Sequence, residues 1–142
     1  MKSIVFYSND FNMCFSLLIY LQNNYKVTTT TDLDIVKSIV KTSDLDLLIM
    51  DTDPSEIIEC YLKDIRKVKT NLPIVLTYVF KNQIKELDTK LREYVNSIFY
   101  KPFDLNEISM KLSLMVWNKN SLFKEAMNDF FQKNFGSNGF FG

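Results

Sequence analysis

The fold is decided by residues 45–51, which read Leu-Asp-Leu-Leu-Ile-Met-Asp. The four consecutive apolar residues at 47–50 predict a β-strand buried on both faces, since a strand with one solvated face alternates apolar and polar positions. The run ends abruptly on a carboxylate, Asp51. Strands of this kind belong to parallel sheets that are covered by helices on both faces.

A helix is predicted directly after this strand. Asp53, Pro54 and Glu56 match the N-cap, first and third positions of a helix start, where side chains bind backbone amides that have no helical partner. We therefore predict that Asp53 caps a helix that runs to about Val68. A buried strand that leads straight into a helix is the repeating unit of an α/β sheet.

The same alternation recurs along the chain. Apolar, β-branched runs predict strands, and apolar residues at helical spacing predict helices. Asp32 or Asp34 is a predicted cap, and Asp104 with Glu107 forms another capping pair. The predicted strands are 2–8, 25–30, 45–51, 73–79 and 96–100, and the predicted helices are 11–23, 33–42, 54–68, 83–94 and 105–116. The predicted fold class is α/β, a doubly wound five-stranded parallel sheet with helices on both faces.

Composition excludes several classes of protein. The chain has 142 residues, of which 46% are hydrophobic and 24% charged, as in ordinary globular domains. No apolar run approaches the roughly 20 residues of a membrane span, so we expect no membrane partner. Lys plus Arg and Asp plus Glu both total 17, which gives no electrostatic basis for direct nucleic-acid binding.

Residue types that the chain lacks or barely uses narrow its chemistry. There is no histidine, and all three glycines lie beyond residue 135. Imidazole catalysis and glycine-rich phosphate loops are thereby excluded. Cys14 and Cys60 are predicted to be reduced, buried thiols, and with no secretory signal ahead of them they favour a cytoplasmic protein.

Residues 119–142 do not continue the repeat. Their apolar positions at helical spacing are Leu122, Phe123, Met127, Phe130 and Phe131, followed by a Gly/Phe tail. We divide the chain into a domain of residues 1–118 and a C-terminal helical extension and tail of residues 119–142. The extension either packs on its own domain and frays, or serves in docking or dimerisation, which would make the chain an assembly or scaffold component. It is too short for a DNA-binding output domain.

Polar side chains gather where predicted strands end. Ligands of open parallel sheets bind beyond the carboxyl ends of the strands. The residues at these ends are Ser8, Asn9, Asp10, Asp51, Thr77, Tyr78 and Lys101, which is followed by Pro102. We expect the acidic residues and the lysine to converge in one pocket.

These segments resemble, in divergent form, the receiver domain of two-component response regulators (CheY-like). The resemblance covers about residues 2–117 and implies a flavodoxin-like sheet with strand order 2-1-3-4-5. The matching segments are Ile-Val-Phe-Tyr-Ser-Asn-Asp at 4–10, the strand at 45–51, and Phe-Tyr-Lys-Pro-Phe at 99–103.

The resemblance implies that Asp51 accepts a phosphoryl group. Mg²⁺ would be held by Asp10, Asn9, Asp51 and the backbone carbonyl of Asp53, oxygen ligands of the kind that this cation prefers. A carboxylate can attack a phosphoryl group only where the charge of the transferring oxygens is offset.

Three further residues take roles from the same resemblance. The Thr77 hydroxyl and the Lys101 ammonium would bind the phosphoryl oxygens, and a cis peptide bond before Pro102 would orient the lysine. The implied function is a two-component signalling module rather than an enzyme, with at most slow autodephosphorylation. Its implied partners are a histidine kinase or phosphotransfer protein and a downstream protein target. A homodimer is expected through helix 83–94, strand 96–100 and helix 105–116, or through residues 119–142.

The sequence departs from the family pattern at three places. Ser8 and Asn9 stand where the family has two acids, so Mg²⁺ is expected to bind weakly. The hydroxyl position falls on either Thr77 or Tyr78. Ile98 occupies the position of the aromatic ring that moves on activation.

Two alternative functions remain open. One is a degenerate receiver that acts as a phosphorylation-independent interaction domain, which Ser8, Asn9 and Ile98 favour. The other is a haloacid-dehalogenase-like phosphohydrolase, in which Asp51 is the nucleophile and Asp53 the acid. Against this enzyme, Asp53 is predicted to cap a helix, and no later acidic pair is present to hold Mg²⁺.

Overall fold

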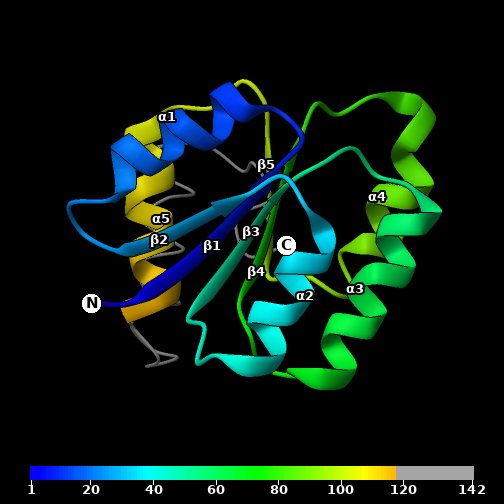
Figure 1. Ribbon diagram of the computed structural model, residues 1–142. Helices are drawn as coiled ribbons and strands as arrows, with labels where there is room; N and C mark the ends of the chain where they lie inside the picture. The colour runs from blue at the N-terminus through cyan, green and yellow to red at the C-terminus, as the bar shows by residue number, and fades with distance from the viewer. Residues whose placement is uncertain (118–142) are drawn as a thin grey trace.

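The computed structural model describes residues 1–117. Five parallel strands form one sheet in the order β2-β1-β3-β4-β5 (Figure 1), so the predicted fold class and strand order are confirmed. The α-helices lie between successive strands and after the last one. The strands are β1 (Ser3–Ser8), β2 (Lys26–Thr30), β3 (Leu47–Asp51), β4 (Ile74–Tyr78) and β5 (Ser97–Tyr100).

Helices cover both faces of the sheet (Figure 1). Helices α1 (Phe11–Leu21) and α5 (Leu105–Trp117) pack on one face, and α2 (Leu33–Thr42), α3 (Glu56–Val68) and α4 (Lys85–Leu91) pack on the other. Every residue of β3 and β4 is buried. Burial on both faces explains why these strands are continuous apolar runs instead of alternating ones.

Helix caps correct one prediction and confirm others. Helix α3 begins at Glu56, and its N-cap is Ser55, whose Oγ accepts a hydrogen bond from the Ile58 amide at 3.1 Å. The prediction that Asp53 caps this helix is therefore wrong. A hydroxyl directly before the first turn serves as the cap, which leaves Asp53 exposed after β3. By contrast, Asp32 caps α2 as predicted.

Three further predictions have definite outcomes. Asp104 accepts hydrogen bonds from the backbone amides of the first turn of α5, which confirms it as the cap. Cys14 is buried, but Cys60 is exposed on α3, so the prediction of two buried thiols is wrong for Cys60. The predicted helix 83–94 is shorter, because the 3₁₀ turn η1 (Asn82–Ile84) precedes α4.

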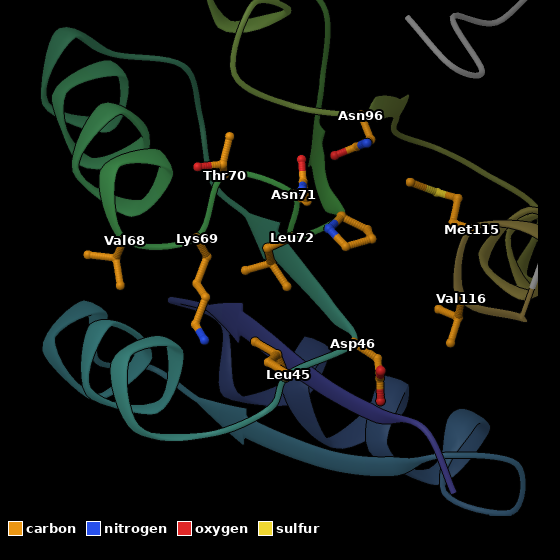
Figure 2. A pocket seen from close by; sticks show the side chains of 11 residues that line it. Leu45, Asp46, Val68, Lys69, Thr70, Asn71, Leu72, Asn96, Met115 and Val116 are labelled. Atoms are coloured by element: carbon orange, nitrogen blue, oxygen red, sulfur yellow. The ribbon is translucent and has the colours of Figure 1, made fainter. Parts of the chain in front are cut away.

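A hollow of about 710 Å³ lies by the loops that lead into β3, β4 and β5 (Figure 2). Beside this hollow, Arg66 forms hydrogen bonds with two loops. Its guanidinium donates to the carbonyls of Leu72 at 2.6 Å and Tyr94 at 2.8 Å, and to Asn96 Oδ1 at 3.0 Å. Arg66 therefore fixes the loops that lead into β4 and β5.

Among residues 1–117, no helix is long and apolar enough to cross a bilayer. The predictions for the extension at 119–142, including its docking or dimerisation, lie outside the described residues.

Candidate functional site

Strand register brings the predicted site residues together. In the sheet, Asp51 at the end of β3 lies opposite Ser8 of β1 on one side and Thr77 of β4 on the other. Lys101 directly follows β5, and its backbone amide donates to the Tyr78 carbonyl at 2.9 Å. Residues from four segments of the sequence therefore meet at one edge of the sheet.

Three donors bind the Asp51 carboxylate. Thr77 Oγ1 donates to Oδ1 at 2.8 Å and Ser8 Oγ donates to Oδ2 at 2.7 Å. Lys101 Nζ lies 2.7 Å from Oδ1. Asp51 is only 8% exposed, so these partners replace much of the water that would otherwise solvate it. An ammonium and two hydroxyls around one carboxylate are also suited to stabilising additional negative charge.

A pocket of about 260 Å³ opens over this carboxylate. Its lining residues are Ser8, Asn9, Asp10, Asp51, Thr52, Asp53 and Lys101. The expected convergence of acids and lysine is thus present in the structure. The Lys101–Pro102 peptide bond is cis, the geometry that the resemblance implied.

The predicted magnesium ligands come from Asn9, Asp10, Asp51 and Asp53, which all line this pocket. Among residues 1–117, no group of three His, Cys, Asp or Glu side chains is close enough to hold a metal ion. Asp10 Oδ1 caps α1, where it accepts from the Asn12 amide at 2.9 Å. Asn9 Oδ1 accepts from the Tyr7 hydroxyl at 2.9 Å. Carboxylate, amide and carbonyl oxygens are ligands of the kind that Mg²⁺ prefers, so the chemistry of these residues fits this cation.

The structure assigns the two candidate hydroxyls to different faces of β4. Thr77 contacts Asp51, and Tyr78 points to the opposite face because successive strand residues alternate. The sequence did not predict that Ser8 binds Asp51, because Ser8 was considered only as a residue that replaces one of the family's acids. Its position at the end of β1, next to β3 in the expected strand order, could have predicted this contact.

Tyr78 belongs to a second polar cluster that the sequence did not predict. Its hydroxyl donates to Asp88 Oδ2 at 2.5 Å, and the Tyr100 hydroxyl donates to the same oxygen at 2.8 Å. Arg92 Nε donates to Asp88 Oδ1 at 3.1 Å. The cluster joins α4 to β4 and β5, and its two tyrosines are the sequence neighbours of Thr77 and Lys101. Ile98, at the position of the expected ring, is fully buried.

We predict that this cluster makes stability fall at alkaline pH. Burial, the larger cause, and the hydrogen bond to Asp88 both raise the pKa of Tyr78 above the ordinary tyrosine value. Burial likewise raises the pKa of Tyr100. As the pH rises, the two phenols lose their protons at a lower pH in the unfolded chain than in the folded one. The stability that these tyrosines contribute is therefore fully present below about pH 10 and is lost as the pH rises further. Denaturant titrations between pH 8 and 11 should show a shallower decline for Tyr78→Phe than for the wild type, and equal slopes would contradict the assignment.

Comparison with known proteins establishes the fold. No family model matches the sequence, and no curated protein matches it. Solved structures do match. A two-component response regulator from Clostridium difficile has a TM-score of 0.71 at 18% identity, covering 84% of this chain and 99% of that one. The response regulator TrrA from Thermotoga maritima, in complex with Mg²⁺-BeF, has a TM-score of 0.68 at 21% identity, covering 81% and 99%.

An adenylate cyclase from Rhodopirellula baltica also matches, with a TM-score of 0.70 at 16% identity over 94% of this chain and 98% of that one. Since several of the matching structures are receiver domains of response regulators, the chain has the CheY-like receiver fold. At these identities the likeness concerns the fold alone.

Proposed function

We propose that this protein is a receiver module that accepts a phosphoryl group on Asp51 and signals through protein contacts. The observation that carries the proposal is the meeting of Asp51, Lys101 and Thr77 at the carboxyl edge of the sheet, with both partners within 2.8 Å of Asp51. The receiver fold of the solved structures supports the same role. A signalling domain, rather than an enzyme with turnover, is the function we infer.

In the proposed reaction, an Asp51 oxygen attacks the phosphorus of a donor. The new P–O bond forms as the bond to the donor's leaving group breaks, and the leaving group keeps that electron pair. Lys101 and Thr77 would stabilise the negative charge on the transferring oxygens by ionic and hydrogen-bonding contacts. Asp10, Asn9, Asp51 and the Asp53 carbonyl would hold Mg²⁺, which when bound would further neutralise that charge.

Partners and location follow from this proposal. The donor would be a histidine kinase or a phosphotransfer protein, and a protein target would bind the surface formed by α4, β5 and α5. We place the module in the cytoplasm, where such donors act. A homodimer through the same surface is part of the proposal.

A degenerate receiver is the second candidate function, and two observations favour it. Ser8 brings a neutral hydroxyl to the Asp51 carboxylate where the family has an acid. Ile98 offers no mobile ring. In this alternative, the α4, β5 and α5 surface binds its target constitutively.

Labelling with acetyl phosphate tests the proposal. In the presence of Mg²⁺, we expect the intact mass to increase by one phosphoryl group per chain, with a label that is labile in base. Asp51→Asn should abolish the label, whereas Asp53→Asn, a matched change in the same pocket, should retain it. Absence of label in the wild type would favour the degenerate receiver.

The same experiment addresses the phosphohydrolase alternative. Because Asp53 does not cap α3, its carboxylate is free of the helix-capping role that argued against this enzyme. Catalytic turnover of a generic phosphate ester, lost in Asp53→Asn, would replace the receiver proposal with a hydrolase. We expect no such turnover.

A further inference from the structure

Helix α1 has an outer face unlike that of a solvated helix. Its sequence, Phe-Asn-Met-Cys-Phe-Ser-Leu-Leu-Ile-Tyr-Leu, contains no charged residue, whereas each of the four other α-helices within residues 1–117 carries at least two. A surface helix ordinarily presents charged and polar residues to water, and a helix that is apolar all round is ordinarily buried. The composition of α1 is therefore that of a helix with a covered outer face.

The uncovered apolar residues of α1 form a single row. Phe11, Phe15 and Ile19 are 72%, 55% and 50% exposed. They are spaced four residues apart, so they lie along one side of the helix over about 12 Å. Beside the row, a hollow of about 330 Å³ separates α1 from β2, the edge strand of the sheet. Cys14, Leu18 and Thr29–Thr31 complete its lining.

We propose that the C-terminal extension of the same chain, residues 119–142, docks on this row. Its sequence carries a complementary row, Phe123, Met127 and Phe131, at the same four-residue spacing and therefore of the same length when helical. Rows of this spacing are the ridges that interlock in the commonest class of helix packing. The inference stands apart from phosphorylation of Asp51.

The polar and charged residues of the extension also support its docking on α1. Glu125, Asp129 and Gln132 fall on the side of the predicted helix opposite Phe123 and Phe131. Docking of the apolar row would bury both rows at once and turn these polar side chains to water. The extension would thereby supply the charged outer face that α1 lacks.

The position of the extension in the chain, after α5, supports the same docking. Helices α1 and α5 pack on the same face of the sheet, where the Tyr20 hydroxyl donates to Asn106 Oδ1 at 2.9 Å. This hydrogen bond places the end of α1 beside the first turn of α5, and Trp117 lies about 16 Å further along α5. Residues 118–122 can span about 17 Å when extended, which is enough to lead the chain back toward α1. Because the segment is tethered, its effective concentration at α1 is in the millimolar range, which favours it over a second copy of the chain.

Hydrogen exchange on the full-length chain tests the proposal in both directions. Phe15→Asp should raise amide exchange in residues 122–131 about tenfold or more, and Met127→Asp should raise exchange in residues 11–21, because coupling between two surfaces is reciprocal. Ile57→Asp is the matched control, since Ile57 is 76% exposed on α3 on the other face of the sheet and should change neither segment.

Each outcome of this experiment either supports or overturns the docking proposal. Reciprocal changes in a chain that stays monomeric in size-exclusion chromatography with light scattering support the proposal. Unchanged exchange in residues 122–131 on Phe15→Asp would overturn it, as would changes that appear only in a concentration-dependent dimer, which would assign the row to a second copy. Met127→Asp alters no described residue, so it remains informative even if Phe15→Asp perturbs α1 itself.

Discussion

Replacing Asp88 by alanine is expected to lower the free energy of unfolding by about 3–5 kcal/mol, the range found when one partner of a buried ion pair is removed. Asp88 is buried and accepts hydrogen bonds from Tyr78, Tyr100 and Arg92. Without the carboxylate, two phenol hydroxyls and a half-buried guanidinium lose their shared acceptor. Chemical denaturation monitored by circular dichroism measures the loss.

Asp64→Ala is the matched control for this substitution. Asp64 is also a helical aspartate with cationic neighbours, Lys37 at 3.3 Å and Lys67 at 4.0 Å, but its side chain is 54% exposed. Exposed pairs of this kind contribute about 0–1 kcal/mol. If both variants lost the same small amount, the cluster around Asp88 would not be what holds α4 to β4 and β5.

Replacing Lys101 by methionine is the second large effect. The Asp51 carboxylate would keep the Ser8 and Thr77 hydroxyls but lose the only cation that the described residues place against it. We expect a loss of about 2–3 kcal/mol, below the range for fully buried pairs because the Lys101 side chain is 34% exposed and solvent screens the pair. Equilibrium denaturation at neutral pH measures it.

A double variant separates loss of the ion pair from loss of packing. Asp51→Asn in the Lys101→Met background removes the uncompensated carboxylate, so it should restore much of the lost stability. Lys67→Met is the control for losing a lysine whose side chain is 80% exposed, and it should cost less than about 0.5 kcal/mol. If Lys101→Met matched Lys67→Met, the contact between Lys101 and Asp51 would have no energetic weight.

The candidate site shows where sequence patterns were informative. Asp51 and Lys101 were found because each ends or directly follows a strongly apolar strand, and a parallel sheet gathers such positions at one edge. Asp10, which the sequence placed in the pocket, both lines it and caps α1 in the structure. The two roles use the same side chain, so local sequence could not choose between them.

Two parts of the site could not be predicted from local pattern. Asp53 and Ser55 both precede the first turn of α3, and only the path of the chain after β3 makes Ser55 the cap. Two partners of Asp88, Tyr78 and Tyr100, lie 10 and 12 residues away, at the ends of two strands. Their meeting depends on how α4 packs against the sheet, which no short-range spacing encodes.

The sequence by itself determined the α/β class, the five strands and the edge of the sheet at which the polar residues collect, because burial periodicity is written locally in apolar runs. Only the tertiary structure decided that Ser8, Thr77 and Lys101 all bind one carboxylate, that Tyr78 serves a different cluster on the opposite face, and that α1 leaves an apolar row uncovered. These facts depend on register and side-chain direction between distant segments, and a shift of one residue in a strand would have reversed them.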